Sequence, residues 1–243
     1  MDSISIIRTP IESELEAFKE LYDSSLSSSN TLLDSVVAHI RQRSGKMMRP
    51  ILVLLVARLY GVVSPATLHA AVSLELLHNA SLVHDDVVDE STERRGQLSV
   101  NAIFNNKVAV LTGDYLLATS LVHAELTNSH QIIRLVSSLG QDLADGELLQ
   151  LSNVSNHSFS ETVYFDVIRK KTAALFAACT EAAAYSVGVS EEEVKLARLL
   201  GEYIGICFQI KDDIFDYFDS KEIGKPTGND MLRQTDTPCL VCT

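Results

Sequence analysis

Cysteine and positive charge are both scarce in this chain. Its 243 residues include four cysteines, which are too few and too scattered for a disulfide scaffold in a chain of this length. Cys239 and Cys242 form a C-x-x-C pair that lacks the further ligands a zinc site needs. Lys and Arg total 20 against 32 Asp and Glu, which gives a formal net charge of −12. Binding to a nucleic-acid backbone needs a basic surface, so we expect no nucleic-acid partner.

Long hydrophobic runs are also missing. Hydrophobic residues make up 46% of the chain and the mean hydropathy is +0.13, but charged residues or histidines interrupt every apolar run before it reaches membrane-spanning length. We therefore predict no transmembrane segment. The chain from Met1 onward lacks a basic region followed by an apolar core, so we expect no signal peptide and a cytoplasmic location.

The few prolines leave long periodic segments intact, which favours helices. None of the five prolines interrupts a segment with apolar residues at i, i+3 and i+4. No linker or shift in composition marks a second domain, so the sequence predicts one all-α domain. The expected helices cover residues 51–60, 65 to the first aspartate cluster, 107–125, 130–151, 160–186 and 191–218.

Two copies of one acidic motif lie inside apolar stretches. Residues 85–89 read D-D-V-V-D and residues 212–216 read D-D-I-F-D. On a helix the first and last aspartates of each motif share a face, and such like charges destabilise a helix by ~0.2–0.5 kcal/mol. One motif alone could equally be a solvated helix face, but two copies favour a cation. Mg²⁺ binds one or two protein carboxylates and completes its shell with water and phosphate oxygens, so we predict metal-bound diphosphate.

Two pairs of basic residues are placed where they could bind phosphate. Lys46 and Arg49 precede a predicted helix N-terminus, where backbone amides and the helix dipole favour an anion. Alone, such residues are more often solvated charges. Arg94 and Arg95 follow the first acidic motif, and arginine forks suit phosphate oxygens. The alternative for these arginines is ordinary ion pairing with neighbouring glutamates.

An ordered series of motifs between Gly45 and Asp230 resembles the all-trans polyprenyl diphosphate synthases. The motifs are, in order, G-K-M-M-R-P, L-L-H-N-A-S-L-V-H-D-D-V-V-D-E, R-R-G, G-D-Y-L-L-A, G-E-L-L-Q-L, K-T-A-A-L-F, F-Q-I-K-D-D-I-F-D-Y and G-K-P-T-G-N-D. The resemblance implies the isoprenoid synthase fold, a large single-domain helical bundle around a central cavity. It also implies a homodimer and two aspartate motifs that face each other across the cavity mouth.

The reaction implied by the resemblance is a repeated head-to-tail condensation. Isopentenyl diphosphate would attack an allylic diphosphate, with up to three Mg²⁺ ions bound, to give a long all-trans polyprenyl diphosphate. Ala80 and Ser81 lie one turn before the first aspartate motif, where short-chain relatives place an aromatic plug. We therefore expect a product longer than fifteen carbons, such as a quinone side-chain precursor, which could be passed to a membrane.

The resemblance also implies roles for individual residues. A lone histidine in an apolar helix is more often a core residue, and only its motif position favours a binding role for His78. Metal binding falls to Asp85, Asp89, Asp212 and Asp216, with Asp86 and Asp213 in support. The implied catalytic residues are Lys171, Thr172 and Gln209, of which Thr172 and Gln209 lie along the path of the allylic cation. The allylic diphosphate is bound by Arg94, Lys171 and Lys225, and isopentenyl diphosphate by Lys46, Arg49, His78 and Arg95.

The end of the chain departs from the family pattern. The predicted synthase domain covers residues 1–231, and residues 232–243 form a tail that does not match, so we expect a truncated or frame-shifted product. A catalytically impaired form, or a non-catalytic partner subunit of a prenyl synthase, remains the alternative. A terpene cyclase is a distant third, since its second metal motif is typically not a full aspartate triplet.

Overall fold

The structure is almost entirely helical, as the sequence predicts. The computed structural model describes residues 3–42, 45, 47–94, 96–156 and 160–217. One two-stranded antiparallel hairpin, which the sequence did not predict, pairs Glu93 with Leu98 and Arg94 with Gln97. The elements are α1 (Ser3–Arg8), the 3-10 turn η1 (Thr9–Ile11), α2 (Glu12–Ser25), α3 (Thr31–Gln42), α4 (Met48–Tyr60), α5 (Pro65–Val88), β1 (Glu93–Arg94), β2 (Gln97–Leu98), α6 (Val100–Phe104), α7 (Asn106–Leu126), α8 (His130–Asn156), α9 (Glu161–Ile168), the π-helical turn η2 (Arg169–Ala173), α10 (Ala174–Ser186) and α11 (Glu191–Tyr217).

Local sequence signals set most helix ends. Ser64 and Thr67 form a reciprocal capping box at the start of α5, in which the Thr67 amide donates to Ser64 Oγ at 3.3 Å. Ser160 caps α9 by accepting from the Val163 amide at 3.2 Å. Gly61 ends α4 as expected. Two expected boundaries were wrong, because α4 begins at Met48 and α8 continues beyond residue 151 to Asn156. Helices α1, α2, α3 and α6 were not expected from the sequence.

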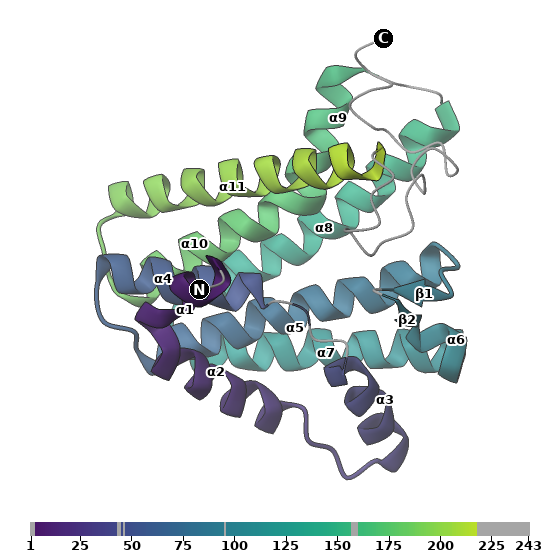
Figure 1. Ribbon diagram of the computed structural model, residues 1–243, viewed down its shortest axis with the longest axis horizontal. Coiled ribbons are helices and arrows are strands. Elements are labelled where there is room, and N and C mark those ends of the chain that lie inside the picture. The colour runs from purple at the N-terminus through teal and green to yellow at the C-terminus, as the bar shows by residue number, and fades with distance from the viewer. Residues whose placement is uncertain (1–2, 43–44, 46, 95, 157–159, 218–243) are drawn as a thin grey trace.

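Helix α5 is the centre of the bundle. It packs against α7, α4, α10, α2 and α8, and nearly all its side chains from Ala70 to Ala80 are buried. Its apolar character on all sides is typical of a helix enclosed by others. Helix α11 packs on α10 and η2, on the far side from α5 and α7 (Figure 1). The C-terminal ends of α5, α8 and α11 lie at the same end of the bundle (Figure 1).

Two glycines let α11 lie unusually close to its neighbours. A Cβ atom on Gly205 would lie 2.5 Å from the Cα of Ala173, and one on Gly201 would overlap Thr180 and the Phe176 carbonyl. The two glycines are one turn apart and face α10 and η2. This contact fixes the axial position of the next two turns of α11, which carry Gln209 and Asp213.

A π-helical turn joins α9 to α10 and carries three polar residues of the site region. The sequence predicts one continuous helix over residues 160–186, and the structure keeps the chain helical there but widens it at Arg169–Ala173. The turn includes Lys170, Lys171 and Thr172. Single π-helical turns within α-helices occur frequently at functional sites.

Within the described part of the chain, we find no helix whose length and hydrophobicity would let it span a membrane.

Replacement of Gly205 by alanine tests the close packing of α11. We expect Gly205→Ala to lower the free energy of unfolding by about 1–3 kcal/mol, because the added methyl group must displace α11 from Ala173. The measurement is urea denaturation followed by circular dichroism. The control is Gly140→Ala in α8, where an added Cβ atom would have no atom beyond the local helix backbone within 4 Å and the better helix propensity should stabilise the protein by about 0.5–1 kcal/mol. Equal effects of the two changes would contradict the packing argument.

A histidine pair connects the two central helices. His69 on α5 and His123 on α7 lie with their Nδ1 atoms 3.0 Å apart, so one ring donates a proton to the other. Burial lowers the pKa of His69, and burial followed by the charge of His69 lowers the pKa of His123 to about 4. Protonation of both rings would replace this hydrogen bond with two facing donors.

This pair predicts a pH-dependent stability. The folded-state pKa of His123 lies below its ordinary value of 6.5, so the unfolded chain binds more protons between these values. The contribution of the pair to the free energy of unfolding is therefore complete above about pH 6.5 and is lost as the pH falls toward 4. We expect the urea midpoint to fall over this range and to fall less in His123→Asn. The exposed His130→Asn is the control, and identical pH profiles for both variants would show that the pair has no such role.

Candidate functional site

The first aspartate motif lies in the last turn of α5, and its members face different environments. Asp86 is buried and accepts a hydrogen bond and ion pair from Nε of Arg94 at 2.5 Å. Its carbonyl accepts from the Ser91 amide at 2.9 Å and from Nδ2 of Asn101 at 3.2 Å. Asp85 is half-buried and Asp89 is exposed at the helix C-cap. Asp86 therefore anchors the hairpin that follows α5, whereas Asp85 and Asp89 remain accessible.

Asp85 lies in a strongly acidic environment. Burial raises its pKa to about 7, and the neighbouring carboxylates of Glu147 and Asp89 act in the same direction, while Lys171 and Arg94 oppose them. Glu147 belongs to α8, and sequence reasoning did not assign it to the site. Its position in the G-E-L-L-Q-L motif was the available signal. Two carboxylates so arranged repel each other and would be stabilised by a cation.

Lysines of the π-helical turn bind this acidic region. Lys171 Nζ lies 2.5 Å from Oε1 of Glu147 and donates to Oε1 of Gln150 at 2.8 Å. Lys170 Nζ lies 2.5 Å from Oδ2 of Asp145. All three acceptors belong to α8, so the π-helical turn is held against that helix. Lys171 brings a positive charge close to both Glu147 and Asp85.

The second motif is joined to the same turn by hydrogen bonds. Asp213 is buried and accepts from the Tyr164 hydroxyl at 2.6 Å and from Nε2 of Gln209 at 2.7 Å. Thr172 Oγ1 donates to Oε1 of Gln209 at 2.6 Å. Asp212 is half-buried, and the side chain of Asp216 lies outside the described residues. Sequence reasoning missed Tyr164, whose place in the apolar run of α9 gave no polar signal.

The two motifs therefore lie at the same end of the bundle, on either side of the π-helical turn. Lys171 contacts Glu147 beside Asp85, and the adjacent Thr172 contacts Gln209 of α11. The C-terminal ends of α5 and α11 lie at the same end in Figure 1. Segments more than a hundred residues apart thus contribute carboxylates, amides and a lysine to one region.

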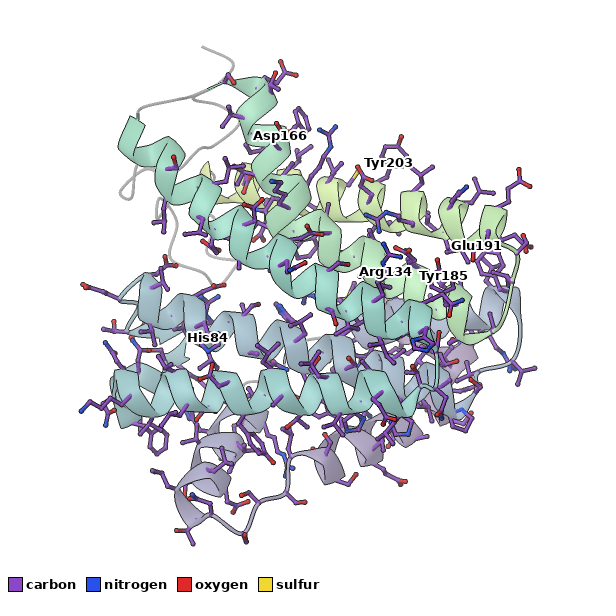
Figure 2. The ribbon with its side chains drawn as sticks, turned by 180° about the vertical axis from the view of Figure 1, so that it is seen from behind. His84, Arg134, Asp166, Tyr185, Glu191 and Tyr203 are labelled. Carbon is purple, nitrogen blue, oxygen red and sulfur yellow. The ribbon has the colours of Figure 1, made fainter. Side chains whose placement is uncertain are left out.

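His84 explains part of another motif. It belongs to α5 (Figure 2), and its ring contacts α7, with Nε2 3.3 Å from the Val110 carbonyl and 3.4 Å from Oδ1 of Asp114. A Cβ atom on Gly113 would lie 2.5 Å from the Cδ2 atom of His84, so only glycine leaves room for this ring. Gly113 and Asp114 of the G-D-Y-L-L-A motif therefore hold the ring of His84, the residue that precedes Asp85.

The residues expected to bind the second diphosphate are only partly described. The Arg49 guanidinium lies 5.4 Å from the centre of the Phe176 ring on α10, and His78 is buried in α5. Burial raises the pKa of the nearby Cys179 thiol to about 12, and the charge of Arg49 opposes this rise. Lys46, Arg95 and Lys225 lie outside the described residues. The structure therefore does not bring the predicted cluster together as a whole.

The donor atoms fit a divalent cation that is shared with a ligand. In the part of the chain that the structure describes, no three His, Cys, Asp or Glu side chains form a complete metal-binding group. Asp85 and Glu147 nevertheless place carboxylates close together, with the exposed Asp89 one turn beyond. Mg²⁺ suits such a partial set because it takes its remaining ligands from water and phosphate.

Known proteins match nearly all of this chain, and the chain spans only part of their length. The "Heptaprenyl diphosphate synthase component 2" of Geobacillus stearothermophilus is 38% identical over 227 residues, which cover 92% of this chain and 70% of that protein. A solved geranylgeranyl pyrophosphate synthase from Bacteroides thetaiotaomicron is 76% identical, with a TM-score of 0.83, over 98% of this chain and 72% of that one. A polyprenyl synthase from Caulobacter crescentus, solved with calcium and isoprenyl diphosphate, is 32% identical with a TM-score of 0.93, over 99% and 74%.

A family model agrees with these similarities. The polyprenyl synthetase model matches residues 30–242. Members of this family are trans-prenyltransferases, and dependence on Mg²⁺ is general among them. The all-α fold and the family expected from the sequence are both confirmed, and the names of the relatives support the expected head-to-tail condensation to a long all-trans product. This chain belongs to the polyprenyl synthetase family.

Proposed function

We propose that this chain condenses isopentenyl diphosphate with an allylic diphosphate, head to tail and repeatedly, to give an all-trans polyprenyl diphosphate. The observation that carries the proposal is the group of Asp85, Glu147 and Lys171, which Thr172 links to the second aspartate motif. Carboxylates that need a cation and a lysine that can bind phosphate suit a metal-bound diphosphate. Relatives named as heptaprenyl and octaprenyl diphosphate synthases support a long product.

The metal and the allylic diphosphate would share one set of residues. Up to three Mg²⁺ ions would be held by Asp85, Asp89, Asp212 and Asp216. When bound, Mg²⁺ supplies positive charge that stabilises the diphosphate as it leaves. Lys171 now binds Glu147 and Gln150, so it exchanges these partners for phosphate oxygens when the substrate arrives. Arg94 and Lys225 complete the cationic side of this site.

A second group of residues would hold isopentenyl diphosphate without metal. We assign this role to Lys46, Arg49, His78 and Arg95. The described members support a position inside the bundle, since His78 is buried and Arg49 packs over Phe176. Two separate sites for two diphosphates distinguish a condensing enzyme from a cyclase, which uses one.

The chemical step requires stabilisation of charge more than a side-chain base. The allylic carbon–oxygen bond breaks and its electron pair leaves with the diphosphate. The double bond of isopentenyl diphosphate then attacks the cation, and the departing proton passes to the released diphosphate. Thr172 and Gln209 present oxygen dipoles along the path of the cation, and Lys171 holds the leaving group, so preorganised electrostatics lower the barrier.

The residues one turn before Asp85 support a product longer than fifteen carbons. Ala80 is buried and small, and Ser81 is half-buried with its hydroxyl donated to the His78 carbonyl at 2.9 Å. Neither side chain is large enough to stop a growing chain. A product of this length is apolar and is suited to delivery to a membrane.

A homodimer would cover an exposed apolar face of α7. Large hydrophobic side chains on this helix are solvent-exposed, and a hollow of about 430 Å³ lined by Asn106, Lys107, Val110 and Leu111 opens at its N-terminal end. Patches of this kind mark protein interfaces. A second copy of the chain is the occupant we propose. The exposed side chains are Val110, Leu111, Leu121, Val122 and Leu126.

A non-catalytic subunit is the second candidate function. The relative from Geobacillus stearothermophilus is named as a component, which indicates an enzyme made of more than one kind of chain. In that case the purified chain would bind diphosphate without turnover, and a partner would restore activity. Incorporation of labelled isopentenyl diphosphate by the chain alone distinguishes the two candidates.

Loss of the first metal-binding carboxylate should abolish turnover. We expect Asp85→Ala to reduce Mg²⁺-dependent incorporation of labelled isopentenyl diphosphate by at least about a hundredfold, because the leaving diphosphate loses preorganised charge. Circular dichroism should show an intact fold. The control is Asp34→Ala, an exposed aspartate on α3. Full activity of Asp85→Ala would contradict the metal assignment.

Disruption of the apolar face of α7 should yield monomers. We expect Leu121→Glu combined with Val122→Glu to halve the mass measured by light scattering, because four buried charges would face each other across the interface. Leu59→Glu, at an exposed position near the end of α4, should leave the mass unchanged. A dimer that survives the double change would place the interface elsewhere.

A further inference from the structure

Four side chains, two of them buried and two half-buried, form a series of hydrogen bonds through the second motif. Tyr164 of α9 donates to Oδ2 of Asp213 at 2.6 Å, and Gln209 Nε2 donates to Oδ1 of Asp213 at 2.7 Å. Thr172 Oγ1 then donates to Oε1 of Gln209 at 2.6 Å. Tyr164 and Asp213 are both buried. The chain therefore runs from the interior of the protein out to the half-buried Thr172.

The chemistry of Asp213 fixes the donor and the acceptor of each hydrogen bond in this series. An ionised carboxylate only accepts hydrogen bonds, so both Tyr164 and the Gln209 amide nitrogen must donate to it. With its nitrogen turned to Asp213, Gln209 presents its amide oxygen to Thr172. The hydroxyl hydrogen of Thr172 is then used on Gln209. Its oxygen lone pairs are left as the groups that Thr172 can offer to other atoms.

We propose that Tyr164 is a positioning residue for the condensation, because it holds Asp213 in the orientation that turns the lone pairs of Thr172 toward the allylic cation. This inference rests on the proposed function. Oxygen lone pairs stabilise positive charge, whereas a hydroxyl hydrogen aimed at the cation would oppose its formation. Tyr164 acts through Asp213 and Gln209 and does not itself touch the substrate.

The geometry explains why a tyrosine occupies a buried apolar position of α9. Its ring packs with the core while its hydroxyl needs a partner there. Removal of the hydroxyl takes away the hydrogen bond that Tyr164 donates to Oδ2 of Asp213. The carboxylate can then rotate within the site. The effect should appear in turnover, because Gln209 and Thr172 lose their fixed orientation, and much less in diphosphate binding, which depends on other residues.

The test compares Tyr164→Phe with the wild-type chain in steady-state kinetics. We expect kcat to fall about tenfold or more, which corresponds to about 1.4 kcal/mol, with KM for both substrates within about twofold of wild type. The matched control is Tyr203→Phe, which removes the same atom from an exposed tyrosine on the outer face of α11 (Figure 2). It should retain wild-type kinetics.

A double-mutant cycle tests whether the effect passes through Thr172. Thr172→Val removes the lone pairs, so adding Tyr164→Phe to it should cost less than about twofold. Additive losses would overturn the inference, as would a kcat of Tyr164→Phe equal to wild type. If Tyr164→Phe does not fold, Asp213→Asn replaces it in the same cycle, since an amide removes the direction without changing the shape. An inactive wild-type chain would overturn the proposed function and this inference together, whereas an active wild type with an unaffected variant would overturn the inference alone.

Discussion

Repulsion between carboxylates at one end of the bundle is the constraint on which the site depends. Asp85 is half-buried beside Glu147 and Asp89, and Lys171 offsets only part of this negative charge. Such an arrangement costs folding free energy unless a cation joins it. Burial raises the pKa of Asp85, with the charges of Glu147 and Asp89 acting in the same direction, and the same surroundings make the region a binding site for a metal ion and its diphosphate. In the last turn of α5, the carboxylates that favour binding of a metal ion therefore lower the stability of the fold without that ion.

The packing of the helices determines which residues share this region. Gly201 and Gly205 bring α11 against α10 and η2, so that Gln209 can reach Thr172. The π-helical turn places consecutive side chains on different partners, with Lys171 on α8 and Thr172 on α11. A regular α-helix turns by about 100° per residue. The π-helical turn is wider than a regular α-helix at this point. The local irregularity thus connects the two acidic motifs.

The sequence was sufficient for the long helices after residue 50 and for the two motifs, but not for α1, α2, α3 and α6 or for the partners of the motif residues. Periodic apolar residues predict these helices, because that signal is local. Glu147 and Tyr164 were missed because their roles depend on contacts between residues far apart in the chain. The widening at residues 169–173 likewise has no signature in the periodicity. Lys46, Arg95 and Lys225 lie outside the described residues, and their assignments rest on motif position alone.

Coupling between metal and diphosphate is the most direct test of the shared-cation site. Binding of Mn²⁺ in place of Mg²⁺ can be titrated by electron paramagnetic resonance, with and without a non-reactive allylic thiolodiphosphate. The account predicts that the analogue tightens Mn²⁺ binding by about tenfold or more, and that Mn²⁺ tightens binding of the analogue by the same factor, because such coupling is reciprocal. Equal Mn²⁺ affinity with and without the analogue would contradict it.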